Sequence, residues 1–94
     1  MTPVVTDNPA ALRYEIRAGG DLAGFAAYTR LHGVITFTHT EIDPAYEGQG
    51  LGSTLARAAL DGARAAGLRV RPHCPFIRAY IERHPEYADL VDPG

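Results

Sequence analysis

A glycine-rich stretch directly ahead of an amphipathic pattern constrains this fold more than any other feature of the sequence. The segment EGQGLGSTL, residues 47–55, places three glycines in five positions. Apolar residues then recur every three or four positions, which predicts a helix from Gln49 or Gly50 to about Ala66, ended by Gly67. Because a helix N-terminus has unpaired amides and a partial positive charge, a bare glycine backbone there suits an anion.

Three strands are predicted ahead of this helix. Residues 12–17 alternate apolar and polar, with Leu12, Tyr14 and Ile16 on one face. Residues 22–30, with Phe25 and Tyr28, and the β-branched residues 34–41 follow. The segments AGGD (18–21) and RLHG (30–33) have the residues of tight turns, so the three strands form an antiparallel meander. Residues 1–11, which contain two prolines, are predicted to be an irregular leader.

A short strand and a second helix are predicted after the first helix. Residues 68–71 form the strand, which lies parallel to residues 34–41 because the helix acts as a crossover. The second helix begins at Pro75 with Cys74 at its N-cap, has an apolar face of Phe76, Ile77, Tyr80 and Ile81, and ends at His84-Pro85. The tail EYADLVDPG packs as one short turn. The predicted fold class is α+β, as a single domain over residues 1–94 with its core at about 10–91.

Composition limits the classes of partner and site. The net charge is −2, and all nine cations are arginines, which gives no overall footprint for nucleic acid. Arg64, Arg69 and Arg71 are either a phosphate-binding patch or, as charge patterning favours, a solvated face. A single cysteine, no signal peptide and no apolar run near 18 residues predict a cytoplasmic protein without a membrane segment. The four histidines lack the spacing of metal ligands, so no metal is expected.

The glycines do not match two common phosphate-binding motifs. A Walker loop needs a lysine, and the sequence has none. The dinucleotide fingerprint would need a glycine at Ser53. A loop that serves only turn formation and helix–sheet packing, without a ligand, remains an alternative.

Two segments nevertheless resemble a known family. IDPAYEGQGLGSTLARAALDGARAAGLRV resembles motif A of the GNAT N-acetyltransferase superfamily, Gln/Arg-x-x-Gly-x-Gly/Ala, with Gly50 and Gly52 as the matching glycines. PHCPFIRAYIERHPEY is similar to the second half of the compact, single-domain YjdJ-type members, so the resemblance covers about residues 10–91. Glu47 departs from the motif, because a carboxylate brings no positive charge to a pyrophosphate. Binding would then depend more on backbone amides and on arginines such as Arg57.

The resemblance implies a minimal GNAT-like fold, with splayed parallel strands, that binds acetyl-CoA or coenzyme A. Loop amides would hold the pyrophosphate, and pantetheine would pair with the strand backbone near Thr40. The cofactor-binding residues expected from this are Glu41, Ile42, Asp43, Gln49, Gly50, Leu51, Gly52, Ser53, Thr54 and Cys74. The two helices that larger members insert between their first strands, and the strands that follow their last helix, are not expected here.

Four residues are candidates for catalysis in such a site. Cys74 at a helix N-cap would feel a macrodipole that favours the thiolate, although a lone cysteine is commonly a small buried hydrophobe. His39 and Glu41 lie two positions apart on one face of a strand, and either could be the general base or an ordinary surface side chain. Tyr80 could protonate the leaving thiolate or belong to the core. His73 is expected to point away from Cys74.

The leading hypothesis is an acetyl-CoA-dependent N-acetyltransferase whose acceptor is the amine of a small molecule or a protein. Direct transfer in a ternary complex is the default route, and an acetylated Cys74 is possible. A non-catalytic module of the same fold that binds CoA or another protein is the first alternative. A phosphate-ligand domain unrelated to CoA is the second. The chain is expected to be a monomer or a weak dimer.

Overall fold

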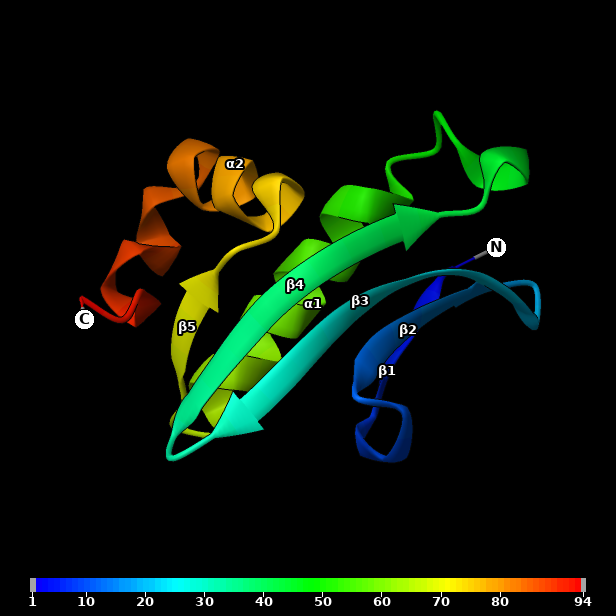
Figure 1. Cartoon of the computed structure of the whole chain (residues 1–94). Coiled ribbons are helices and arrows are strands. Elements are labelled where there is room, and N and C mark those ends of the chain that lie inside the picture. The colour runs from blue at the N-terminus through cyan, green and yellow to red at the C-terminus, as the bar shows by residue number, and fades with distance from the viewer. Residues whose placement is uncertain (1, 94) are drawn as a thin grey trace.

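The computed structural model describes residues 2–93, which form a mixed sheet with helices. Five strands pair in the order β1-β2-β3-β4-β5, antiparallel except for β5, which lies parallel to β4 (Figure 1). They are β1 (Val4–Asn8), β2 (Arg13–Ala18), β3 (Asp21–Leu31), β4 (Val34–Ile42) and β5 (Arg69–Pro72). The helices are α1 (Leu51–Ala65) and α2 (Pro75–Arg83), with short 3-10 turns η1 (Pro9–Ala11), η2 (Pro44–Tyr46) and η3 (Pro85–Leu90). The predicted α+β class is confirmed.

The first strand corrects the prediction for the leader. Residues 4–8 pair with β2 along their whole length instead of being irregular. The hydroxyl of buried Tyr28 donates to Asp7 Oδ1 at 2.6 Å, which fixes β1 against β3. Leu12, predicted on the core face, has φ of 54° and is 49% exposed, since it ends η1 before β2 begins. Most side chains of β1 are not buried, so its sequence carries no period-two signal.

The tight turns were predicted correctly because their residues are specific. Gly19 and Gly20 have φ of 61° and 86° between β2 and β3, and His32 and Gly33 have 51° and 79° between β3 and β4. Consecutive residues with positive φ match the twist of the flanking strands.

Helix α1 buries one face against the sheet, and its C-terminus is closed as the sequence predicts. The buried residues are Leu51, Leu55, Ala56, Ala59, Leu60 and Ala63. The spacing in the sequence predicts a stripe of Leu51, Leu55, Ala58, Ala59 and Gly62, of which Ala58 and Gly62 are only half-buried. The amide of Gly67 donates to the carbonyl of Arg64, and that of Leu68 donates to the carbonyl of Ala63. With φ of 71° at Gly67, this is a Schellman motif.

The chain after α2 packs back onto both α1 and β5. The hydroxyl of Tyr87, in η3, donates to Asp61 of α1 at 2.7 Å. Val91 then forms an isolated parallel bridge with Val70 of β5. The tail therefore extends the sheet by one bridge, beyond the single turn that the sequence predicts.

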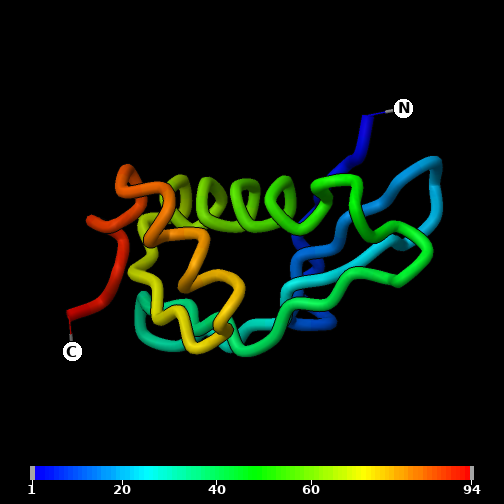
Figure 2. The backbone as a smooth tube through the Cα atoms, turned by 90° about the horizontal axis from the view of Figure 1, so that it is seen from above, coloured from blue at the N-terminus to red at the C-terminus, as the bar shows by residue number. Residues whose placement is uncertain are grey.

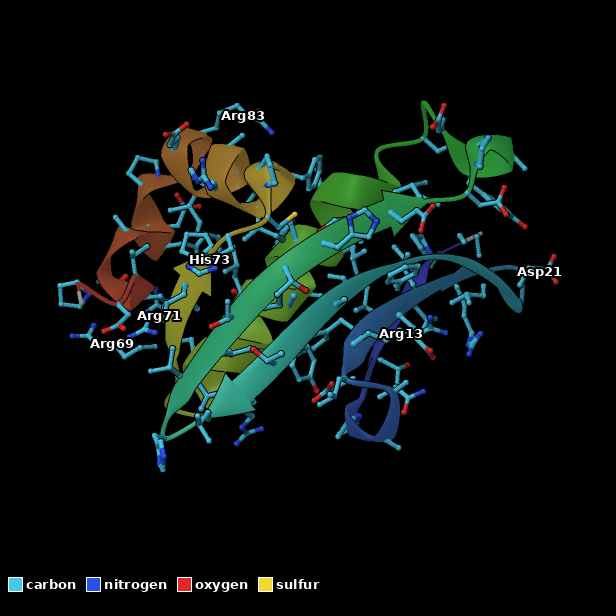
Figure 3. All side chains as sticks on the ribbon, in the orientation of Figure 1. Arg13, Asp21, Arg69, Arg71, His73 and Arg83 are labelled. Carbon is cyan, nitrogen blue, oxygen red and sulfur yellow. The ribbon has the colours of Figure 1, made fainter. Side chains whose placement is uncertain are left out.

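The three arginines considered as a phosphate patch bind this tail. Arg64 donates to both carboxylate oxygens of Asp89 at 2.9 Å, and Arg69 donates to the carbonyl of Asp89 at 2.8 Å. Arg71 pairs with Asp92 at 2.7 Å. Figure 3 shows Arg69 and Arg71 extending from β5 toward the tail. Their guanidinium groups are thus engaged by protein acceptors.

Both helices lie on the same side of the sheet. Figure 2 shows α1 along one face, with α2 beside it over the ends of β4 and β5. The opposite face of the sheet, the outer face, is covered by no helix within residues 2–93. Only the short turn η1 lies between β1 and β2. None of the helices in this part of the chain is long and apolar enough to cross a membrane.

Candidate functional site

Strands β4 and β5 separate at a fixed point. Their pairing runs from Val34 opposite Arg69 to Phe37 opposite Pro72, whereas β4 continues to Ile42. The register of β3 on β4 shifts between Ala27 and Tyr28, which leaves Thr38 as a bulged residue. A bulge bends a strand and increases its twist, so it explains why β4 leaves its partner here. The splayed strands implied by the family resemblance are present.

Cys74 lies at the point of separation, where β5 gives way to α2. Its amide donates to the carbonyl of Phe37 at 2.8 Å, and its thiol is 3.2 Å from the hydroxyl oxygen of Thr40. The side chain is 2% exposed, and the residue is the N-cap of α2 with Pro75 as the first helical residue. His73 is exposed, in agreement with the expectation that neighbouring side chains point in opposite directions. Cys74 therefore has the predicted position, within reach of β4.

The two base candidates lie on the other face of β4. His39 Nε2 and Glu41 Oε2 are 3.7 Å apart, and each side chain is 62% exposed. The ring of Phe25 on β3 lies 6.0 Å from that of His39. Because Thr38 is bulged, Thr40 faces the helices and contacts Cys74 while His39 and Glu41 face outward. The structure thus brings His39 and Glu41 together but places them on the opposite side of β4 from Cys74.

Tyr80 is part of the packing between α2 and the tail. It is 4% exposed, and its ring stacks on that of His84 with centroids 4.1 Å apart. Burial raises the pKa of the Tyr80 hydroxyl, and the positive charge of Arg57 opposes that rise. The phenol is therefore neutral near neutral pH and able to donate a proton or a hydrogen bond. No hydrogen bond or ring contact joins Tyr80 to Cys74.

The glycine loop brings an uncapped helix end to the surface. Gly48 and Gly50 have φ of 82° and 73°, and Gly50 is the N-cap of α1. No side chain of the described residues caps this end, and the first helical hydrogen bond is donated by the amide of Thr54 to Gly50. The amides of the preceding three residues, 51–53, are thus left without a partner inside the helix. A β-carbon at Gly48 or Gly50 would meet nothing within 4 Å.

A pocket of about 320 Å³ lies beside these amides. Leu51, Ser53 and the three glycines line it together with Ile42 from β4, Tyr46, Glu47 and Phe76 from α2. Of the predicted loop residues, Gln49 does not line it, and the hydroxyl of Thr54 is bonded to the carbonyl of Gly50 at 3.3 Å. Backbone amides beside open glycines fit an anionic pyrophosphate, whereas the carboxylate of Glu47 opposes it.

Phe76 is the pocket residue that sequence reasoning placed wrongly. It was assigned to the apolar core face of α2, but it is 36% exposed. Its ring lies against Gly52, where a β-carbon would be 2.8 Å from Phe76 Cζ. Gly52 therefore permits close packing of α1 and α2 as well as keeping the loop bare. The sequence does not show that the ring of Phe76 is exposed, because its position depends on packing against Gly52 of another helix.

Comparison with known proteins gives consistent results. The model of the GCN5-related N-acetyl-transferase family matches residues 13–90. The mouse protein NATD1 is 32% identical over 62 residues, which cover 64% of this chain and 56% of NATD1. Streptothricin acetyltransferase of Streptomyces lavendulae is 43% identical over 73 residues, which cover 69% of this chain and 39% of that protein. The chain therefore spans about half the length of these relatives or less.

A solved structure has a similar fold. The solution structure of a GCN5-like protein from Staphylococcus aureus superposes with a TM-score of 0.71 over 95% of this chain and 87% of that one. The two sequences are 21% identical, so this likeness concerns the fold.

Proposed function

Because this chain belongs to the GCN5-related N-acetyltransferase family, we propose that it transfers an acetyl group from acetyl-CoA to an amine. The observation that carries the proposal is the separation of β4 from β5 beyond Phe37, with the uncapped end of α1 beside it. Beyond Phe37 the edge of β4 is not paired with β5, and the first amides of α1 have no partner inside the helix. Both are suited to an extended ligand with an anionic end.

The chain's own groups divide the binding of coenzyme A between them. The amides of residues 50–53 would hold the pyrophosphate, with Phe76 and Tyr46 as walls of the pocket. The backbone of residues 40–43 would pair with pantetheine as a further strand would. Cys74 would lie beside the reacting end. When bound, acetyl-CoA supplies an acetyl thioester.

The side chains on β4 and α2 supply proton transfer. An amine bound as an ammonium ion must lose a proton before its lone pair attacks the acetyl carbon, and Glu41 or His39 on the outer face accepts it. The C–N bond forms as the C–S bond breaks, and the departing sulfur takes a proton. Tyr80, whose raised pKa keeps it protonated, is the proposed donor. In this assignment the amine approaches β4 from the outer face, and the departing sulfur lies on the face that the helices cover.

Cys74 offers a second route for the acetyl group. In that route the thiol gives up its proton, Sγ attacks the acetyl carbon, the leaving sulfur takes a proton, and the amine then displaces Sγ. The hydroxyl of Thr40, 3.2 Å away, accepts the thiol hydrogen bond in the resting protein. If this route is used, mass spectrometry after incubation with acetyl-CoA alone is expected to detect an acetylated Cys74. Cys74→Ala with unchanged turnover would eliminate this route.

Isothermal titration with acetyl-CoA and with CoA is the test of the proposal. Binding with release of CoA in the presence of an amine is the expected result. Binding without release toward any amine would favour a non-catalytic module, for which the opposing charge of Glu47 in the pocket is an argument. Competition by ADP or phosphate as strong as that by CoA would favour a general phosphate site. No heat and no thermal shift with millimolar cofactor would overturn the proposal.

A further inference from the structure

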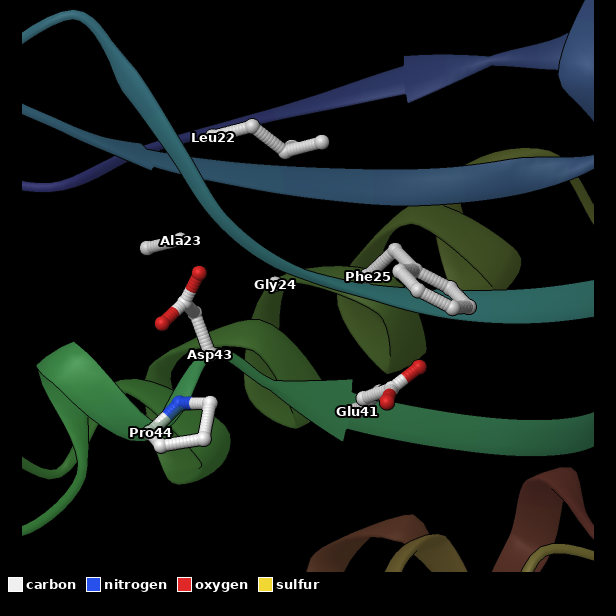
Figure 4. Close-up of a pocket in the computed structure, with 7 residues that line it drawn as sticks. All are labelled: Leu22, Ala23, Gly24, Phe25, Glu41, Asp43 and Pro44. Carbon is white, nitrogen blue, oxygen red and sulfur yellow. The ribbon is translucent and has the colours of Figure 1, made fainter.

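A second pocket, of about 200 Å³, opens beside the end of β4 (Figure 4). Its apolar wall comes from Leu22, Ala23 and Phe25 of β3 and from Pro44 after β4. Neither the glycine loop nor α2 contributes to it. At about 30 Å³ per water molecule, its volume equals about seven waters, which suits a small side chain.

Strand irregularity explains why the pocket forms here. The register of β2 on β3 shifts so that Ile16 pairs with Gly24 and Arg17 pairs with Leu22, which leaves Ala23 as a bulge. At Gly24 a β-carbon would lie 2.5 Å from the carbonyl oxygen of Glu41, so glycine allows β3 and β4 to approach closely. The bulge and the close approach leave Leu22 38% exposed at the edge of the pocket.

Two carboxylates give the pocket its charge. Glu41 lies beside Phe25 on the neighbouring strand, and Asp43 is directed toward Ala23 and Gly24 (Figure 4). One oxygen of Asp43 accepts the amide of Ala45 at 2.9 Å, which fixes the side chain and leaves its second oxygen for a ligand. Apolar walls under two carboxylates are complementary to a cation on a short hydrocarbon stem.

The arginine that lies over the ring of Phe25 is engaged by another carboxylate. Arg13 lies over the ring of Phe25, with Cζ 4.9 Å from the centroid. Its Nε donates to Glu15 at 2.7 Å, and Glu15 is only 5% exposed. Arg17 is bonded to the other oxygen of the same carboxylate at 3.1 Å. Both arginines are thus paired with Glu15. His39 Nε2 lies 3.7 Å from Glu41, so Asp43 is the carboxylate of the pocket that has no ion-pair partner among the described residues.

We propose that this pocket binds the acetyl acceptor as a protonated primary amine on a short apolar stem, such as an alkylamine or a lysine-like side chain. The inference rests on the proposed acetyl transfer and adds the class of acceptor to it. Glu41 connects this pocket with the proposed site of acetyl transfer at Cys74. It lines the pocket, and it follows Thr40, whose hydroxyl oxygen is 3.2 Å from the thiol of Cys74. Acidic acceptors and heavily hydroxylated amines are excluded by the charge and the apolar walls.

Direct binding is measured first, without cofactor and without turnover. Pentylamine, pentanoate and glucosamine are titrated into ¹⁵N-labelled protein, and the amide shifts of Gly24 and Glu41 are followed. Pentylamine is expected to bind at least about tenfold more tightly than the other two, because only it combines positive charge with an apolar stem. Equal affinity for pentylamine and pentanoate would overturn the proposal.

A matched pair of surface variants then tests the location. Leu22 and Leu31 are both exposed leucines on β3, and Leu31 lies outside this pocket. Leu22→Lys puts a positive charge into the pocket, which repels the ammonium group of pentylamine. This variant is expected to weaken pentylamine binding at least about tenfold, whereas Leu31→Lys is expected to leave it unchanged. Asp43→Asn, which can still accept the amide of Ala45, is expected to weaken binding as well. Thermal unfolding verifies that each variant folds.

Cofactor titration and acetylation distinguish this inference from the proposed function. In the transfer reaction Leu22→Lys is expected to raise the KM for pentylamine while kcat and the Kd for acetyl-CoA change less than about twofold. If acetyl-CoA does not bind but pentylamine does, acetyl transfer is wrong and the amine site stands. If transfer occurs and Leu22→Lys behaves as Leu31→Lys does, the amine site is wrong and the proposed function stands.

Discussion

Replacing Gly52 by alanine tests the packing on which the cofactor pocket depends. The new β-carbon would be 2.8 Å from Phe76 Cζ and 3.4 Å from Cε1 and Cε2, so the ring must move. Alanine favours a helix over glycine by about 0.5–1 kcal/mol. Displacing the ring from its rotamer costs about 0.5–1.5 kcal/mol. Because Phe76 is partly exposed and has room to move, Gly52→Ala should change the free energy of unfolding by less than about 1 kcal/mol.

The decisive quantity is the coupling between the two positions. In a Phe76→Ala background the obstacle is gone, so Gly52→Ala should stabilise the protein by about 0.5–1 kcal/mol. The double-mutant cycle is thus expected to give a coupling energy of about 0.5–1.5 kcal/mol, measured by urea unfolding. Gly48→Ala is the control, since it places alanine at φ of 82° with open space around it and should destabilise both backgrounds equally. Equal stabilisation by Gly52→Ala in both backgrounds would refute the packing of Phe76 on Gly52.

Three further predictions concern charge. Glu47→Arg is expected to lower the Kd for CoA by about threefold to tenfold at low salt in isothermal titration, and weaker binding would show that the pyrophosphate lies elsewhere. Hydrogen bonding from Arg13 is the main cause that lowers the pKa of Glu15 from 4.5, so the charged carboxylate stabilises the fold above pH 4.5 and this contribution is lost as the pH falls through the lowered pKa. Glu15→Gln should lower Tm at pH 7, and the difference from wild type should shrink as the pH falls below 4.5. Burial, with a hydrogen bond to Asp61, raises the pKa of Tyr87 from 10.0 to about 12, so its contribution is present below pH 10 and lost as the pH rises through 12. Tyr87→Phe should cost about 1–2 kcal/mol at pH 7 and flatten the alkaline part of the stability profile measured by urea unfolding.

Local sequence patterns predicted the elements around the site because those elements have strong local signals. The change from alternating to helical periodicity locates β4 and α1, and Gly67 ends the helix through a left-handed backbone conformation that glycine adopts readily. Cys74-Pro75 begins α2 as expected, since proline lacks an amide that the first helical turn would leave unpaired. These features depend on residues close together in the chain.

Features that depend on distant partners escaped prediction. The strand at residues 4–8 is defined by its pairing with β2 and buries too little to show a period. Leu12 appeared to belong to an alternating strand, but η1 turns it to solvent. Phe76 fits an apolar helix face in sequence, whereas its ring in fact lies at the surface over Gly52. For β1 and Phe76 the neighbour that decides the outcome is distant in the sequence, whereas Leu12 is decided by the turn η1 directly before it, whose left-handed cap an alternating pattern does not show.

The bulge at Thr38 is the feature that most directly connects fold to proposed chemistry. With uninterrupted alternation, His39 and Glu41 would share the helix-facing side with buried Phe37, and Thr40 would face outward. One extra residue reverses this, so that Thr40 meets Cys74 while the imidazole and carboxylate face outward. The same residue lies where the pairing of β4 with β5 ends. A thiol ligand and a cationic amine can therefore approach one strand from opposite faces without competing for space.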